Sequence, residues 1–275
     1  MNQPFNSHSS NESNASAPQS RVVLVTGAAK RIGRHIALAM AQQGWDVVVH
    51  FGTSTDAAAE VVAQIAAMGQ RAVAIQADLD DEQATRALFN SAREAMGAIH
   101  CVVNNASLFE EDRASTFSQH CLDQHMHANL AAPIILAHAL HAATPEGQQA
   151  SVINLLDQKL YNLNPDFLSY TLSKAALQCA TTMLAQALAP KVRVVGVAPG
   201  ITMVSGHQTE ADFSVAHQAT PLGYSSTPED IARSVLFIAN SPAMTGTTLL
   251  VDGGQHLIPL QRDIMFIATA TESHS

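Results

Sequence analysis

Short apolar runs alternate with longer amphipathic stretches along the chain from Arg21 onward. The apolar runs are rich in valine and isoleucine, which favours buried strands, and the stretches between them have helical periodicity. The predicted strands are Val22–Thr26, Asp46–His50, Ala72–Gln76, His100–Asn104, Ser151–Leu155, Val192–Val197 and Thr248–Val251. The predicted helices cover residues 32–43, 55–68, 82–96, 118–143, 168–188 and 228–240, the last beginning at Pro228-Glu229-Asp230.

This alternation predicts an α/β fold. Strands that are apolar on both faces are typical of a parallel sheet covered by helices on either side. Seven strands with no break in composition predict a single-domain, Rossmann-type doubly wound fold with a seven-stranded parallel sheet over residues 21–256.

The two ends of the chain differ from this domain in composition. Residues 1–20 lack the apolar core of a secretory signal, which argues against such a signal. Their serine- and asparagine-rich composition buries too little apolar surface to fold, which predicts a disordered N-terminal tail. Residues 257–275 form a C-terminal tail. Its apolar part, Leu257–Ile267, is expected to pack either at a subunit interface or against its own subunit.

The composition of the chain argues against several classes of protein. The 275 residues are 47% hydrophobic with a formal net charge of −9, which disfavours nucleic-acid binding. No apolar run approaches the ~20 residues of a membrane span. The scattered cysteines Cys101, Cys121 and Cys179 are typical of reduced thiols in a cytoplasmic protein. The 13 histidines do not combine with carboxylates or thiols in a ligand arrangement, so no metal site is predicted.

The first predicted strand leads directly into Thr26-Gly27-Ala28-Ala29-Lys30-Arg31-Ile32-Gly33 and then into a helix. A glycine at such a turn lets the backbone approach a phosphate, and the helix N-terminus offers free N–H groups. The loop has two glycines rather than the three of G-x-G-x-x-G, so its position carries the prediction. An ordinary strand–helix turn is the alternative. The expected dinucleotide contacts here are Gly27, Lys30, Arg31, Ile32 and Gly33.

The end of the second strand bears on the choice of cofactor. A dinucleotide without a 2′-phosphate usually meets a carboxylate there, which bonds the ribose hydroxyls. Here His50-Phe51-Gly52-Thr53-Ser54 precedes the first carboxylate, Asp56, and Lys30 and Arg31 can pair with a phosphate. The sequence therefore favours NADPH over NADH, with His50, Phe51 and Ser54 among the cofactor contacts.

Three further segments follow strands at the edge where open α/β sheets bind ligands. Asp78 is expected to accept a hydrogen bond from the adenine amino group or, alternatively, to cap the next helix. Small residues in Asn104-Asn105-Ala106-Ser107 permit close contact with the nicotinamide ribose. The predicted contacts from these segments are Asp78, Leu79, Asn105, Ala106, Ser107, Pro199, Gly200 and Thr202.

Tyr170 and Lys174 stand four residues apart in a predicted helix, so their side chains share one face. A nearby ammonium favours the phenolate and typically lowers a pKa by ~1–3 units, which brings tyrosine towards proton transfer at neutral pH. Asp157 precedes Tyr170 by 13 residues. A Tyr-x-x-x-Lys pair alone is common in helices without chemistry, but the segments at the strand ends favour a catalytic interpretation.

Together these motifs resemble the short-chain dehydrogenase/reductase family from roughly Arg21 to His256. The resemblance implies that Tyr170 is the proton donor and that Lys174 holds the nicotinamide ribose. It also implies that Asn129 anchors a water chain to the lysine; a helix-surface asparagine is the alternative. The chain departs from the family pattern at Arg31, Ser107 and Asp157, which stand where the family has glycine, glycine and the catalytic serine.

These departures resemble the pteridine reductases and the related dihydromonapterin or dihydrofolate reductases. The resemblance implies NADPH-dependent hydride transfer to a C=N bond of dihydrobiopterin, dihydromonapterin or dihydrofolate. A carboxyl group suits this reaction because it can accept from a ring N–H and pass a proton, which serine cannot do at neutral pH. The implied substrate contacts are Arg31, Ser107, Phe109, Asp157 and Tyr170, with Phe109 stacked on the pterin.

Several points stay open at this stage. Phe109 can alternatively be a loop residue packed into the core, and Thr53 stands where some pteridine reductases have an arginine that binds the 2′-phosphate. Residues 203–226 are expected to form a substrate lid, and the family implies a cytoplasmic homotetramer. The alternative functions are a general carbonyl reductase acting on ketones or quinones and a dinucleotide-sensing regulator without turnover.

Overall fold

The computed structural model describes residues 21–205 and 208–266. The predicted tail 1–20, residues 206–207 of the predicted lid and residues 267–275 of the C-terminal tail lie outside the described residues. The strands are β1 (Val22–Val25), β2 (Asp46–Phe51), β3 (Ala72–Gln76), β4 (Cys101–Asn104), β5 (Ala150–Leu155), β6 (Val192–Pro199) and β7 (Thr248–Val251). The α-helices are α1 (Arg31–Gln42), α2 (Thr55–Ala67), α3 (Glu82–Met96), α4 (Gln119–Met126), α5 (Ala132–Ala143), α6 (Leu168–Ala187), α7 (Glu210–Gln218) and α8 (Pro228–Ala239).

The seven strands form one parallel sheet in the order β3-β2-β1-β4-β5-β6-β7. The predicted Rossmann-type doubly wound fold is therefore confirmed. β1 pairs with both β2 and β4, so the strand order reverses between β1 and β4. Ligands of open α/β sheets bind at the carboxyl ends of the strands beside such a reversal.

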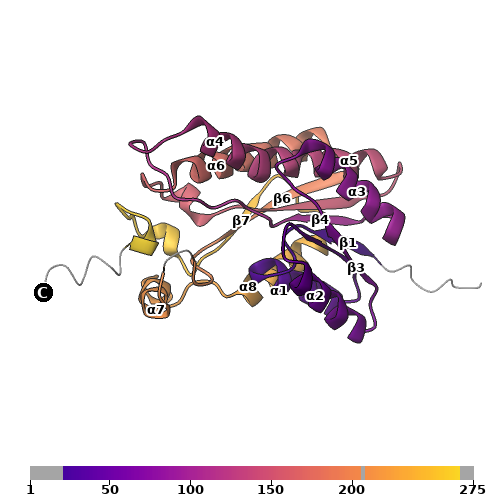
Figure 1. Cartoon of the computed structure of the whole chain (residues 1–275), viewed down its shortest axis with the longest axis horizontal. Coiled ribbons are helices and arrows are strands. Elements are labelled where there is room, and N and C mark those ends of the chain that lie inside the picture. Colours follow the sequence, from indigo (N-terminus) through magenta and orange to yellow (C-terminus); the bar gives the residue numbers. More distant parts are fainter. Residues whose placement is uncertain (1–20, 206–207, 267–275) are drawn as a thin grey trace, which may run out of the picture.

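Two helical layers cover the sheet. Figure 1 shows α1, α2 and α8 on one face and α3, α4, α5 and α6 on the other. Successive strand side chains point to opposite faces. Val23 and Val25 of β1 accordingly belong to the core beneath α1, α2 and α8, whereas Val22 and Leu24 belong to the core beneath α3 and α5. All four residues are at most 2% exposed, which explains the continuous apolar pattern of the strand.

The predicted helix over residues 118–143 is interrupted. α4 ends at Met126, and a π-helical turn, η1 (His127–Ala131), connects it to α5. A π turn inserts one extra residue into an α-helix, a change that periodicity over a short stretch does not reveal. Asn129 lies in this turn and is 1% exposed, so the alternative of a helix-surface asparagine is wrong.

The lid and the C-terminal segment contain elements that the sequence pattern did not predict. α7 lies within the predicted lid and begins with a capping box of Thr209 and Asp212. After β7 the chain forms two 3₁₀ turns, η3 (Gln255–Leu257) and η4 (Ile264–Phe266). η4 contacts α7, and Ile264 is only 7% exposed. η4 therefore packs against its own subunit, whereas Leu257 is 66% exposed. The domain limit at residue 256 stays a prediction.

Candidate active site

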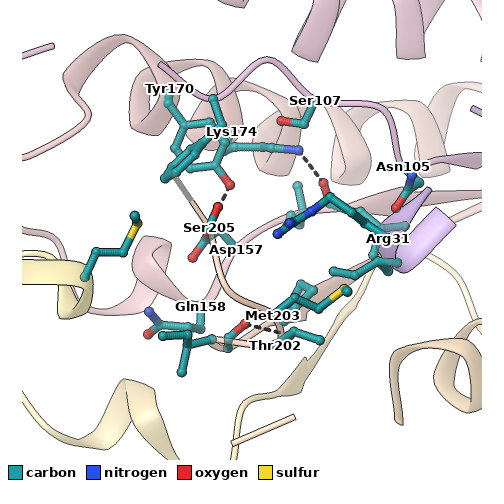
Figure 2. Close-up of a pocket in the computed structure, with 18 of the residues that line it drawn as sticks. Arg31, Asn105, Ser107, Asp157, Gln158, Tyr170, Lys174, Thr202, Met203 and Ser205 are labelled. Carbon is teal, nitrogen blue, oxygen red and sulfur yellow. Dashed lines mark hydrogen bonds between the residues drawn. The ribbon is translucent and has the colours of Figure 1, made fainter. Parts of the chain in front are cut away.

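A cavity of about 470 Å³ opens at the carboxyl ends of β1, β4, β5 and β6. It brings together most of the residues that the sequence predicts for the nicotinamide half of a dinucleotide and for the substrate (Figure 2). The predicted residues that line it are Gly27, Lys30, Arg31, Ile32, Gly33, Asn105, Ala106, Ser107, Phe109, Asp157, Tyr170, Lys174, Pro199, Gly200 and Thr202.

The loop after β1 is built for close backbone approach. Gly27 has a φ of +63°, a conformation that glycine adopts without strain. A Cβ on Gly33 would lie 2.2 Å from the Gly27 oxygen and 2.5 Å from Asn105 Nδ2, so only glycine fits there. No side chain caps α1, whose first turn lines the cavity, so its N–H groups are available to an anion. This cradle fits a dinucleotide pyrophosphate.

Arg31 takes the place of a glycine at a strained position. Its φ is +52°, the left-handed region that costs an L-residue roughly 1–2 kcal/mol. The guanidinium donates from Nη1 to the Val204 oxygen at 2.8 Å, which links the first loop to the segment leading into the lid. Arg31 is exposed and lines the cavity, as the resemblance implies for a residue that reaches cofactor and substrate.

His50 supports the loop from below instead of lining the cavity. Its ring is 2% exposed, Nδ1 accepts from the Gly27 N–H at 3.0 Å, and Nε2 lies 3.2 Å from the Ala77 oxygen. The partners assign the proton to Nε2. Burial lowers the pKa of His50, although the hydrogen bond to Ala77 opposes this, so the ring stays neutral and keeps its accepting nitrogen for Gly27.

Asn105 joins β4 to the same loop. Its Nδ2 donates to the Thr26 oxygen at 2.9 Å, and its N–H donates to Thr26 Oγ1 at 3.0 Å. The Ala106 N–H donates to the same hydroxyl at 3.0 Å. Asn105 thus fixes the start of the first loop through its hydrogen bonds to Thr26, in addition to lining the cavity.

Other predicted cofactor residues lie outside this cavity. Asp78 is exposed, and its Oδ1 accepts from the Asp80 N–H at 3.0 Å. The alternative that Asp78 caps α3 is wrong, because Asp81 is the N-cap and accepts from the Ala84 N–H at 2.6 Å. The remaining predicted contacts with the adenine half, Phe51, Ser54 and Leu79, also do not line the cavity.

Tyr170 and Asp157 form the central polar contact of the cavity. The tyrosine hydroxyl donates to Asp157 Oδ2 at 2.7 Å (Figure 2). Asp157 also accepts from the Lys159 N–H at 2.8 Å as the N-cap of the 3₁₀ turn η2 (Gln158–Tyr161). Burial raises the pKa of Asp157, while the hydrogen bonds from Lys159 and Tyr170 oppose it.

The prediction that Lys174 lowers the pKa of Tyr170 is wrong. Burial, followed by the charge and hydrogen bond of Asp157, raises the pKa of Tyr170 well above its ordinary value. Lys174 Nζ lies 5.8 Å from the centroid of the tyrosine ring and donates instead to the Leu155 oxygen at 2.7 Å. Tyr170 is therefore a neutral phenol that can donate a proton.

Lys174 is itself perturbed. Burial lowers its pKa from 10.5 to about 8, although the charge of Asp157 opposes this. The lysine is 2% exposed, so water does not solvate its ammonium well. An ammonium with this pKa is readily held by ribose hydroxyls or a carbonyl oxygen and is readily discharged.

Asn129 lies behind the cavity. Its Nδ2 donates to the Leu108 oxygen at 2.9 Å and to Ser173 Oγ at 3.0 Å, and its Oδ1 accepts from the Leu108 N–H at 2.7 Å. These bonds hold the loop that contains Ser107 and Phe109 against α6. The π turn aims this side chain at the loop, and a role in a water chain stays a prediction.

Phe109 packs within an aromatic row. Its ring stacks on Phe167 with centroids 4.4 Å apart, and Tyr170 meets it edge-on at 4.7 Å. Phe109 is half-buried and lines the cavity, so it is not a core residue. Ser107 is exposed at the same wall and donates to the Leu108 oxygen at 3.2 Å.

Sequence reasoning missed part of the cavity wall. The missed residues come from the strand and turn before Tyr170, from the segments after β6 and β7, from the lid and from the C-terminal segment: Leu155, Leu156, Gln158, Ile201, Met203, Ser205, Gln208, Gln255, Asp263, Ile264 and Met265. The apolar run 257–267 indicated that the C-terminal segment packs against another surface, but it did not indicate that this surface is the cavity. Gln255 is 2% exposed and accepts from the Ile201 N–H at 2.9 Å, so it holds the segment after β6.

The described residues contain no group of three or more His, Cys, Asp or Glu side chains placed to hold a metal ion. None of the helices in residues 21–205 and 208–266 is long and apolar enough to cross a membrane.

Comparison with known proteins places this geometry in a family. The family model described as Enoyl-(Acyl carrier protein) reductase matches residues 27–256. The crystal structure of FolM Alternative dihydrofolate reductase 1 from Brucella canis, complexed with NADP, is 39% identical with a TM-score of 0.82, covering 86% of this chain and 95% of that one. An uncharacterized oxidoreductase of Methylorubrum extorquens is 33% identical over 245 residues, or 86% of this chain and 98% of that protein. A 3-oxoacyl-[acyl-carrier-protein] reductase of Synechocystis sp. is 31% identical over 239 residues, or 85% of this chain and 96% of that protein. With its parallel sheet, its glycine loop and its Tyr170–Lys174 pair, the chain belongs to the short-chain dehydrogenase/reductase family of oxidoreductases.

Proposed function

We propose that this protein is an NADPH-dependent reductase that transfers hydride to a C=N bond of a dihydropterin, giving the tetrahydro form. The substrate is dihydrobiopterin, dihydromonapterin or dihydrofolate. The observation that carries the proposal is the 2.7 Å hydrogen bond from the Tyr170 hydroxyl to Asp157, at the wall of a cavity that also contains Phe109. A relative that is 39% identical, the Brucella canis protein, is named an alternative dihydrofolate reductase.

The reaction needs a hydride at carbon and a proton at nitrogen. NADPH supplies the hydride when bound. Tyr170 holds the proton, because burial and Asp157 keep it neutral. Asp157, whose pKa is also raised by burial, accepts from a ring N–H or passes the proton onward. Phe109 offers its free surface to a flat ring, with stacking worth ~0.5–1.5 kcal/mol beyond burial.

The chain's own groups fit the cofactor. The uncapped first turn of α1 supplies N–H groups for the pyrophosphate, and Lys30 and Arg31 at the cavity wall supply partners for the 2′-phosphate. Ser54, which lies outside the cavity after the end of β2, is a further proposed partner of that phosphate. Lys174, which now donates to the Leu155 oxygen, would exchange that partner for the nicotinamide ribose hydroxyls. The Brucella canis relative is complexed with NADP, which supports this choice.

A general carbonyl reductase is the second candidate, because the Synechocystis relative is a 3-oxoacyl-[acyl-carrier-protein] reductase. Such a reaction needs a hydroxyl donor for the carbonyl oxygen, and Asp157 replaces that hydroxyl. A dinucleotide sensor is disfavoured, because binding without turnover does not require proton transfer through the buried hydrogen bond between Tyr170 and Asp157.

We also propose that the protein is a cytoplasmic homotetramer. Support comes from α6, where Leu172, Cys179 and Met183 lie along one stripe of the helix and are all exposed. An apolar stripe of this kind is typical of a surface covered by another protein chain.

The test follows NADPH oxidation by absorbance with the three dihydropterins and with ketones. We expect turnover with a pterin, and a loss of roughly 100-fold or more in kcat for both Asp157→Ser and Tyr170→Phe. Tyr161→Phe is the matched control, because Tyr161 is 41% exposed and does not line the cavity.

Two outcomes would reject the proposal. Activity on ketones alone that survives Asp157→Ser would make the protein a carbonyl reductase. NADPH binding without oxidation by any pterin or ketone would make it a sensor.

A further inference from the structure

The C-terminal segment, residues 257–266, forms part of the substrate cavity. It follows the last strand, yet Asp263, Ile264 and Met265 line the cavity together with Asp157 and Tyr170. Figure 1 shows the end of the described chain lying beside α7, away from the sheet. A carboxylate from this segment therefore stands in the same cavity as the proton-transfer pair.

A buried carboxylate, Asp166, is one of the groups that hold this segment in place. Asp166 is 1% exposed, and its Oδ2 accepts from Arg262 Nε at 2.7 Å and from the Asp263 N–H at 2.8 Å. Burial alone would raise the pKa of Asp166, but the hydrogen bonds from Arg262 and Asp263 outweigh it and hold the pKa below its ordinary value. The carboxylate thus stays charged and keeps both bonds.

Aromatic rings add a second attachment. Phe266 stacks on Phe167 with centroids 5.9 Å apart and an interplanar angle of 15°, and Phe167 in turn stacks on Phe109. Phe109 meets Tyr170 edge-on. A continuous row of rings therefore runs from the C-terminal segment to the catalytic tyrosine, which fixes the segment relative to the site.

Lys159 connects Asp263 to Asp157. Its Nζ donates to Asp263 Oδ2 at 3.0 Å and to the main-chain carbonyl oxygen of Asp166 at 2.5 Å. Its side chain is only 4% exposed. Its backbone N–H donates to Asp157 Oδ1 at 2.8 Å. The Asp263 side chain is 13% exposed, so neither charge of this pair is well screened by water.

We propose that Lys159 and Asp263 are positioning residues for proton transfer, which set the proton affinity of the Asp157–Tyr170 pair through their opposite charges. The proposal rests on the proposed function, because it assigns these residues a role in the same reaction. Asp263 disfavours a negative charge on Asp157 and Tyr170, and Lys159 favours one on Asp157. The C-terminal segment is thereby a working part of the site.

Other charges act on the pair as well. Four titratable groups surround Asp157. Tyr170 and Lys174 belong to α6, Lys159 belongs to the turn that Asp157 caps, and Asp263 belongs to the C-terminal segment. Arg31 and Lys30 reach the cavity from the first loop. Among these described groups, Lys159 and Asp263 form an ion pair with each other, so replacing one partner leaves the charge of the other unbalanced.

The decisive experiment is a carboxyl ¹³C NMR titration of the protein without cofactor, labelled at aspartate, with the Asp157 signal assigned by Asp157→Asn. We expect Asp263→Asn to move the Asp157 midpoint to lower pH, since a like charge is removed and Lys159 is freed to favour the carboxylate. Lys159→Gln should move it to higher pH. Opposite shifts from two partners of one ion pair are not expected from a purely structural role.

The pH profile of kcat provides a second readout. If a pterin is reduced, Asp263→Asn should move the alkaline limb to lower pH and lower kcat several-fold at the alkaline end, while Lys159→Gln should move the limb the other way. If no pterin is reduced, the proposed function fails but the NMR titration still decides whether the two charges act on Asp157.

Asp46→Asn is the matched control. Asp46 is a 2% exposed carboxylate that binds Arg71 at the opposite edge of the sheet, and its loss should leave the Asp157 midpoint unchanged. If Lys159→Gln does not fold, Asp263→Asn alone carries the test, with Asp263→Glu expected to restore the wild-type midpoint. An Asp157 midpoint that is unchanged in Asp263→Asn, or shifts in the same direction in both variants, overturns the proposal.

Discussion

At the residue scale, burial shifts the pKa values of the proposed catalytic groups more than their neighbours in sequence do. Tyr170 and Lys174 share a helix face, yet burial raises the pKa of the first and lowers that of the second to about 8. Both shifts favour the uncharged form. The site is therefore prepared to hold a proton on the phenol, and a bound cofactor with its hydroxyls and phosphates would change that balance.

Lys174 makes the stability of the protein depend on pH. Its pKa is about 8 in the folded protein and 10.5 when unperturbed, so the unfolded state binds more protons between these values. The free energy of unfolding should rise across this window in the wild type relative to Lys174→Met, and the difference should be constant below about pH 8. Urea denaturation at pH 7, 8, 9 and 10 measures it.

Lys191→Met is the control for this experiment, because Lys191 lies outside the cavity in an ion pair with Glu146. A difference between wild type and Lys174→Met that stays constant up to pH 10 would contradict the prediction.

At the element scale, the first turn of α1 places the charged side chain of Arg31 at the cavity in a backbone conformation that lowers the stability of the protein. Gly33 must be glycine because a Cβ would meet the Gly27 oxygen, but Arg31 occupies a left-handed conformation that glycine would adopt without strain. Two other helices, α7 and α8, show the usual arrangement, since both begin with capping boxes. The uncapped α1 is left free for an anion.

Arg31→Gly should therefore stabilise the protein and weaken cofactor binding. Relief of the left-handed conformation is worth about 1 kcal/mol, which should raise the Tm without ligand. Loss of a charge-assisted bond should raise the Kd for NADPH roughly tenfold or more, and the Kd for NADH less. Calorimetry measures both.

Arg34→Gln is the control, because Arg34 lies one turn further along α1 and donates to Gln64 instead. Equal effects of Arg31→Gly on NADPH and NADH would show that the guanidinium does not contact the 2′-phosphate.

At the scale of the whole molecule, one sheet places residues from distant parts of the chain at a single edge. The carboxyl ends of β1, β4, β5 and β6 supply the cavity, and the C-terminal segment completes it through Asp166. The opposite side of α6 carries the exposed stripe of Leu172, Cys179 and Met183. One helix thus contributes Tyr170 and Lys174 on its inner face and a proposed subunit contact on its outer face.

Met183→Glu should reduce the proposed tetramer to smaller species, because a carboxylate at a 62% exposed position on this stripe would be desolvated in an interface. Light scattering after size exclusion measures the mass. Met68→Glu, at a 39% exposed position after α2, is the control. A wild-type monomer, or a tetramer unaffected by Met183→Glu, would reject this surface.

The sequence by itself determined the strands, most of the helices, the parallel sheet and the identity of Asp157, Tyr170, Lys174 and the first loop as one site. The strands and helices are local features, since apolar periodicity and turn glycines act over a few residues. The grouping of the distant site residues came instead from the resemblance of their motifs to a known family. The sequence did not predict the π turn, the position of His50 beneath the first loop or the direction in which the pKa of Tyr170 shifts. Those depend on burial and on contacts such as Lys159–Asp263, between residues 104 positions apart. Only the tertiary structure decided them, because the desolvation of a charge and the partner that compensates it are set by packing.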